Sequence, residues 1–258
     1  LAKGNEAGTG PYNLTRFKMG DQVVLSAFRY YWRGWKRNQF NQIVFKRISE
    51  SATRRKLIEN GTADITISLS IRDIEVLKNN TQVNVCLDDS FVNLIMFLNT
   101  EKSQLKNKIF RQAISLAFPY KKIITEVMNG YATQSSGLIP KGIWGHSNRL
   151  KGYQFDIKKA AQLISKSKKG RDRFQLLLTY VAGNEKQQKV AELYQTELKK
   201  IGVDMEIRGM SWESQWQLAK NINPENRQDL FMMHWWPDLL SPHSWLYNLY
   251  HSQKDIHF

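Results

Sequence analysis

Cysteine is almost absent from the sequence, with Cys86 as the single thiol among 258 residues. One thiol excludes an internal disulfide and a zinc site built from cysteines. The apolar neighbours Val83, Val85 and Leu87 alternate with polar residues as in a strand. This pattern predicts that Cys86 is a small buried side chain in a strand.

Long apolar runs are also missing. No stretch approaches the roughly 18 apolar residues of a membrane-spanning helix, and a run such as 94–98 has the length of a strand. The first eight residues have no apolar run and do not form a signal peptide. The protein is therefore either cytosolic, or its targeting segment lies outside this sequence.

Motifs for catalysis are not found either. The sequence has no glycine-rich loop with nucleotide-binding spacing and no nucleophile elbow. His234 has no second histidine, cysteine or carboxylate at metal-ligand spacing, so a structural role is expected for it. The sequence thus predicts a binding protein, not an enzyme, and no cofactor.

Acidic residues are outnumbered, with 23 Asp and Glu against 38 Lys and Arg, for a net charge of +15. Such a charge suggests nucleic acid, an anionic surface or an acidic ligand as partner. The basic residues are dispersed, and no nucleic-acid-binding motif accompanies them, so nucleic acid is not the expected partner. A basic module for nucleic acid or anionic surfaces remains the alternative from another class. The densest basic run comprises Lys166, Lys168, Lys169, Arg171 and Arg173.

Strands and helices alternate along the chain, as in an α/β protein. Before residue 100, a glycine-proline turn in 8–17 is expected to lead into a strand, further strands are expected over 22–28, 42–48, 63–67 and 92–98, and a helix over 51–60. Further helices are expected over 107–117, 121–129 and 156–165.

A βαβ unit is the clearest pattern in the second half. Strand 174–180, helix 185–200 and strand 203–209 follow one another, and such a crossover joins parallel strands. A last strand over 229–236 precedes a helix that starts near Ser241.

Four groups of motifs give the chain its resemblance to a known family. In order they are Gly8-Thr-Gly-Pro-Tyr12 with Tyr31-Trp-Arg-Gly34; Phe97-Leu-Asn-Thr100 with Ile109-Phe-Arg-Gln-Ala-Ile114; Leu138-Ile-Pro140 with Trp144-Gly145; and Ile201-Gly-Val203 with Ser211-Trp212 and Trp235-Trp-Pro-Asp238. Their order and spacing resemble the family 5 extracellular solute-binding proteins, which are the dipeptide, oligopeptide and nickel binders of bacterial ABC importers.

This resemblance implies a two-lobed α/β clamp of the type II periplasmic-binding-protein class that closes over its ligand. We expect a fragment of that fold, with part of the first lobe in residues 1–98 and most of the second lobe in 99–258. It also implies a periplasmic, monomeric full-length protein that delivers peptides to an inner-membrane permease. With half of the cleft absent, this chain is expected to bind peptide weakly or not at all.

An aspartate after the last strand of the second lobe binds the ligand's α-amino group in peptide-binding relatives, and Asp238 matches it. A carboxylate beside indoles forms a strong charge-assisted hydrogen bond with an ammonium, whereas the alternative is a plain turn residue. The resemblance further implies that Trp212 lines a side-chain pocket. Either Trp235 or Trp236 can face the cleft fully, but not both, because alternate residues of a strand point to opposite faces. Core packing is the alternative for each tryptophan.

The remaining candidates lie where open α/β sheets bind ligands, at the carboxyl end of a strand. They are Tyr180, Gly183 and Asn184, for which an ordinary turn is the alternative. His234 replaces a glycine common in relatives, and Lys186 is the cation nearest to the Gly183 loop. These departures leave nickel or another small solute as an alternative ligand.

Overall fold

The computed structural model describes residues 8–167 and 173–251. Contacts divide the chain into two compact units, Leu1–Leu87 and Asp88–Phe258. The division lies eleven residues before the boundary expected after residue 98, because strand 93–98 pairs within the sheet of the second unit. The assignment of the units to lobes remains an expectation. Of the basic run from Lys166 to Arg173, residues 168–172 lie outside the described residues.

The first unit combines a small antiparallel sheet with two helices. Its strands are β1 (Tyr12–Lys18), β2 (Gln22–Ala27) and β3 (Gln42–Lys46), and its helices are α1 (Ser51–Glu59) and α2 (Ile71–Lys78). The sheet has the order β1-β2-β3. The two helices are tied together by Asp73, whose carboxylate accepts hydrogen bonds from Ser51 Oγ at 2.5 Å and Ser70 Oγ at 2.7 Å.

Two local expectations for the first unit are wrong. The segment 63–67 forms no strand, and Ile65 is 82% exposed. A strand needs a neighbour for its backbone groups, and none of the described residues pairs with this segment. Cys86 is exposed and lies outside any strand. Alternating apolar residues therefore did not suffice to predict a buried strand there.

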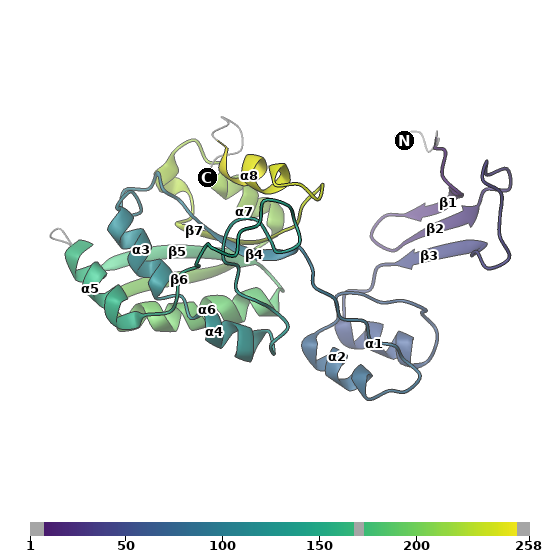
Figure 1. Cartoon of the computed structure of the whole chain (residues 1–258), viewed down its shortest axis with the longest axis horizontal. Helices are drawn as coiled ribbons and strands as arrows, with labels where there is room; N and C mark the ends of the chain where they lie inside the picture. The colour runs from purple at the N-terminus through teal and green to yellow at the C-terminus, as the bar shows by residue number, and fades with distance from the viewer. Residues whose placement is uncertain (1–7, 168–172, 252–258) are drawn as a thin grey trace. The chain divides into compact units, whose positions relative to one another are not determined.

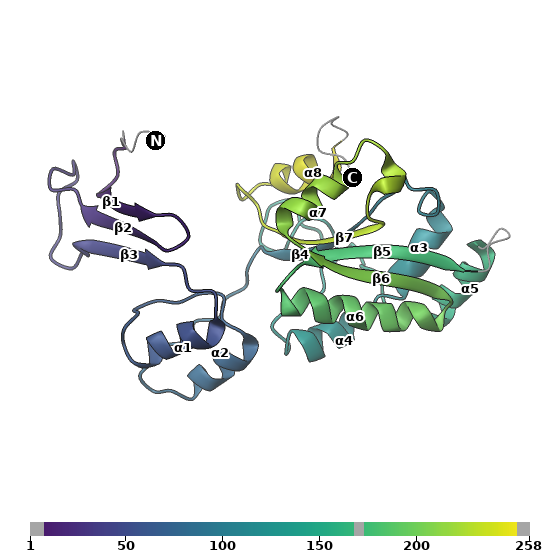
Figure 2. The same ribbon diagram turned by 180° about the vertical axis from the view of Figure 1, so that it is seen from behind.

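The second unit is built on a four-stranded mixed sheet. Its strands are β4 (Asn93–Leu98), β5 (Phe174–Val181), β6 (Val203–Met210) and β7 (Leu230–Trp235). Their order is β4-β7-β5-β6. Strand β5 runs parallel to both β6 and β7, while β4 is antiparallel to β7. The predicted βαβ unit is confirmed, with α6 (Glu185–Lys200) as the crossover helix (Figure 2).

Helices cover both faces of this sheet (Figure 1). On one side lie α3 (Lys108–Leu116), α4 (Tyr120–Lys122), α5 (Ile157–Ser167) and α6, and on the other lie α7 (Trp212–Ala219) and α8 (His243–Tyr250). A 3-10 turn, η2 (Pro224–Asn226), precedes β7. Strand β7 serves both layers: Leu230 and Met232 join the main core, and Phe231 stacks on Trp212 from the opposite face. Because successive side chains of a strand point to opposite faces of the sheet, alternate residues of β7 meet the helices on opposite sides.

The helix expected over 121–129 has an unusual form. After α4 the chain continues as a π-helix, η1 (Ile123–Val127), in which Ile123 and Val127 are buried. Asn129 and Gly130 then adopt positive φ angles of 47° and 80° and end the segment. Both residue types tolerate this left-handed conformation.

Candidate functional site

The carboxyl ends of β5, β6 and β7 meet at one edge of the sheet, because these three strands run the same way. Strand β4 begins at the same edge, where Asn93 pairs with Trp235. Every candidate residue from the sequence lies here. Tyr180, Gly183 and Asn184 close or follow β5, Trp212 follows β6, and Trp235, Trp236 and Asp238 close or follow β7. We call this edge the carboxyl edge.

The tryptophans at the end of β7 have different surroundings. Trp235 is partly buried, and its indole Nε1 donates a hydrogen bond to the carbonyl oxygen of Ser244 in α8 at 3.2 Å. Trp236 is 60% exposed. The first indole therefore fixes α8 to the strand, and the second is available to a ligand.

Asp238 is exposed two residues beyond Trp236. Within residues 8–167 and 173–251, no side chain forms a hydrogen bond or an ion pair with its carboxylate. An exposed carboxylate that has no partner within the protein can accept a hydrogen bond from a ligand ammonium. The same exposure fits an ordinary turn residue after Pro237, so the ligand role of Asp238 stays a prediction.

Trp212 is 40% exposed and belongs to an aromatic stack. Its ring centroid lies 5.5 Å from that of Trp216 and 5.9 Å from that of Phe231. Stacked neighbours hold a ring in one orientation. Trp212 thus presents part of a fixed aromatic face at the start of α7.

Tyr180 lies over the neighbouring strand. A Cβ atom placed on Gly209, its partner in β6, would come within 3.2 Å of the Tyr180 ring. Gly209 therefore leaves room for the ring. Sequence reasoning did not single out this glycine, because the close approach depends on the strand register.

The loop after β5 is a turn closed by a helix cap. Gly183 has a positive φ of 81°, and Asn184 Oδ1 accepts a hydrogen bond from the backbone N–H of Gln187 at 3.1 Å. The Asn184 side chain thus caps α6. The Asn184 side-chain oxygen, which was expected to contact ligand, therefore already accepts a hydrogen bond within the protein.

Gln187 was missed by sequence reasoning. It is only 1% exposed, its Oε1 accepts from the Val181 N–H at 2.9 Å, and its Nε2 lies 3.1 Å from His234 Nδ1. A signal was present in the sequence, since a glutamine three residues after an N-cap asparagine has the spacing of a capping box. Burial and the positive charge of Lys186 lower the pKa of His234 below its ordinary value of 6.5.

A further exposed indole lies on the loop that contains Pro140. Trp144 is 74% exposed. A Cβ on its neighbour Gly145 would lie 3.3 Å from Cγ of Pro242, which precedes α8. The loop therefore approaches the segment that follows Asp238.

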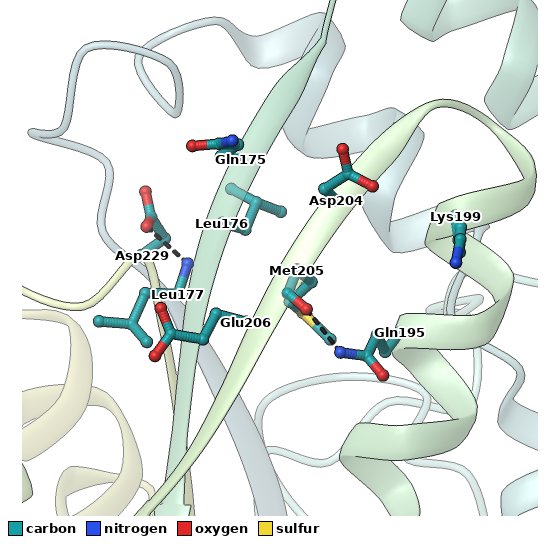
Figure 3. Close-up of a pocket in the computed structure, with 9 residues that line it drawn as sticks. All are labelled: Gln175, Leu176, Leu177, Gln195, Lys199, Asp204, Met205, Glu206 and Asp229. Atoms are coloured by element: carbon teal, nitrogen blue, oxygen red, sulfur yellow. Dashed lines mark hydrogen bonds between the residues drawn. The ribbon is translucent and has the colours of Figure 1, made fainter.

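A cavity of the second unit lies away from this edge. It has a volume of about 560 Å³ and is lined by residues at the amino ends of β5 and β6 (Figure 3). Its polar groups are largely paired within the protein: Asp229 Oδ2 accepts from the Leu177 N–H at 2.8 Å, and Gln195 Nε2 donates to the Met205 carbonyl at 2.6 Å. Open α/β sheets bind ligands at the carboxyl ends of their strands, so the carboxyl edge remains the candidate site.

Across the part of the chain that the structure describes, no three His, Cys, Asp or Glu side chains are grouped so that they could hold a metal ion. Among the same residues, no helix has the length and apolar character required to cross a bilayer.

Comparisons with known proteins agree with the fold. A probable D,D-dipeptide-binding periplasmic protein of Escherichia coli, DdpA, is 28% identical over 251 residues, which cover 97% of this chain and 47% of that protein. A heme-binding protein A of Haemophilus influenzae is 26% identical over 216 residues, 83% of this chain and 39% of that protein. The chain thus spans about half the length, or less, of these relatives.

Solved structures show the same architecture. A periplasmic binding protein of Helicobacter pylori in complex with the peptide STSA matches 94% of this chain and 46% of its own, with a TM-score of 0.78 and 24% identity. NikA of Brucella suis in complex with Fe(III)-EDTA matches 93% of this chain and 50% of its own, with a TM-score of 0.79. The expected α/β fold of periplasmic binding proteins, present in part, is confirmed. Residues 2–256 match the family described as bacterial extracellular solute-binding proteins, family 5, middle region, and the chain belongs to this family.

Proposed function

We propose that the carboxyl edge is one wall of a peptide-binding site in the substrate-binding component of an ABC importer. The observation that carries the proposal is Asp238, an exposed carboxylate two residues after the exposed Trp236 in the chain. The ammonium of a peptide amino terminus matches the carboxylate, and apolar side chains match the indole and the aromatic stack of Trp212.

Known ligands of the relatives support peptides as the substrate class. The names of two relatives specify a D,D-dipeptide and di- or tripeptides, and two solved structures hold the peptides STSA and Met-Leu. The protein acts by binding without catalysis, in the periplasm, and delivers peptide to a membrane permease. Ligand contacts stabilise the closed form of such a clamp, which the permease then recognises.

Amide NMR of this chain during titration with a dipeptide tests the location of the site. The method detects weak binding, which suits a chain that provides one wall. We expect the signals of Tyr180, Asn184 and Trp236 to shift, while those of Gln175 and Glu206 in the cavity of Figure 3 stay unchanged. Shifts confined to the cavity residues would refute the proposed site.

A nickel–histidine chelate, added in a parallel titration, separates the ligand classes. A structure of NikZ from Campylobacter jejuni holds nickel with L-histidine. If the chelate shifts the carboxyl edge and dipeptides do not, the family's solute-binding role stands and the peptide assignment is wrong.

A further inference from the structure

Gln187 links three segments of the candidate site. Its backbone N–H donates to Asn184 Oδ1 at 3.1 Å, and its side-chain oxygen accepts from the Val181 N–H at 2.9 Å. Its amide nitrogen lies 3.1 Å from Nδ1 of His234 on β7. A single buried residue therefore connects three segments: its side chain joins the end of β5 to the last strand, and its backbone N–H bonds to the Gly183–Asn184 loop.

The chemistry of these groups fixes the protonation state of His234. The Val181 N–H can only donate, so the Gln187 oxygen faces it and the Gln187 amide nitrogen faces the imidazole. This nitrogen is a donor, so Nδ1 of His234 must accept and carries no proton. The hydrogen bond thus requires neutral His234 with its proton on Nε2.

Protonation of His234 opposes this arrangement. A proton on Nδ1 would face the Gln187 amide protons across 3.1 Å, donor against donor. Rotating the amide would turn those protons toward the Val181 N–H. Cationic His234 therefore breaks one of the two side-chain bonds, whichever way the amide turns.

The surroundings of His234 also disfavour the cation. From α6 the charged residues at this end are Glu185 and Lys186, and Lys186 lowers the pKa of His234, with burial as the larger cause. Strand β4 presents the apolar Leu94 opposite His234, and β5 carries Tyr180 at this end. Above the ordinary histidine pKa of 6.5, His234 is neutral, and it gains its proton only as the pH falls through its lowered pKa.

We propose that the Gln187–His234 hydrogen bond positions the Gly183–Asn184 loop and the Trp235–Asp238 segment for ligand capture, and that His234 protonation releases them. His234 is thus a positioning residue that makes capture weaken in acid. The inference rests on the proposed function of the carboxyl edge.

The test measures dipeptide affinity and the exchange rate of the Val181 amide proton at about pH 7, where the peptide amino terminus is still mostly an ammonium, and at about pH 5. We expect affinity to fall about tenfold, the effect of one lost hydrogen bond, and the Val181 exchange rate, corrected for intrinsic pH dependence, to rise. His234→Asn keeps an acceptor near the Nδ1 position and cannot titrate, so both values should stay constant with pH.

Gln187→Glu reverses the expected trend. The introduced carboxylate accepts from the Val181 N–H and from cationic His234, so affinity and Val181 protection should increase in acid. His243→Asn on α8 is the matched histidine control and should behave as the unsubstituted chain. If His234→Asn retains the pH dependence, or Gln187→Glu does not reverse it, the proposal is wrong.

The amide measurement separates this inference from the proposed function. If no dipeptide binds at any pH, the peptide assignment fails, while Val181 exchange still reports the hydrogen bond. A Val181 amide whose corrected exchange rate is the same at both pH values would overturn the inference even if peptides bind.

Discussion

Replacing Asp229 with asparagine should destabilise the second unit by about 3 kcal/mol. Asp229 is 3% exposed and immediately precedes β7. Its Oδ2 accepts from Lys102 Nζ at 3.2 Å and from the Leu177 N–H at 2.8 Å, and its Oδ1 accepts from Gln104 Nε2 at 2.6 Å. One carboxylate thus joins the segment after β4 to the middle of β5.

The expected loss of stability follows from the hydrogen bonds of Asp229 that an asparagine side chain cannot accept. Its amide nitrogen must face either Gln104 or the Leu177 N–H with Lys102, so at least one donor meets another donor. Lys102 loses its carboxylate while its side chain is 15% exposed. Removing one partner of a buried ion pair costs about 3–5 kcal/mol, and the remaining oxygen places this variant near the lower limit.

Urea unfolding followed by tryptophan fluorescence measures the change, since most tryptophans lie in the second unit. The midpoint should fall while the slope stays constant. Asp204→Asn, at an exposed carboxylate in the same cavity, is the control and should change stability by less than about 0.5 kcal/mol. A loss below about 1 kcal/mol for Asp229→Asn would refute the reasoning.

Two further predictions concern the core and the first unit. Tyr194→Phe should lower the free energy of unfolding by about 1–2 kcal/mol in urea titrations, because the buried hydroxyl donates to the Ile114 carbonyl at 2.8 Å; an unchanged midpoint would contradict this. The hydroxyl of Ser51, followed by Ser70 and Arg55, lowers the pKa of Asp73 below its ordinary 3.8. The first unit should therefore lose stability as the pH falls below that value, and Asp73→Asn should flatten this acid dependence in circular-dichroism melts.

Local patterns in the sequence predicted most of the second unit. The helical spacing of α6 and the alternation in β6 indicated the βαβ unit, and that unit placed the loop after β5 at the carboxyl edge. Helix α2 was missed, although Ser70 and Asp73 have the spacing of a helix cap with an acidic third position. The failed strand over 63–67 had the right residue types but no partner to pair with.

Long-range contacts set the limit of sequence reasoning. Asp229 meets Leu177 and Lys102, which lie 52 and 127 residues away in the chain. Gln187 and His234 are 47 residues apart. Only the order and register of the strands bring these side chains together, and neither follows from local pattern. Trp235 and Trp236 have different surroundings, as expected for neighbouring residues of a strand that point to opposite faces; ligand contact by either stays a prediction.

Asp238 as the anchor of a peptide amino terminus is the central claim, and NMR titration of this chain with paired ligands tests it directly. The pair is a dipeptide and the same dipeptide acetylated at its amino terminus, each measured with the unsubstituted chain, Asp238→Asn and the control Asp204→Asn. We expect the free dipeptide to bind at least about tenfold more tightly than the acetylated one, with this difference lost in Asp238→Asn and kept in Asp204→Asn. Equal affinity for both ligands, or a preference that survives Asp238→Asn, would contradict the account.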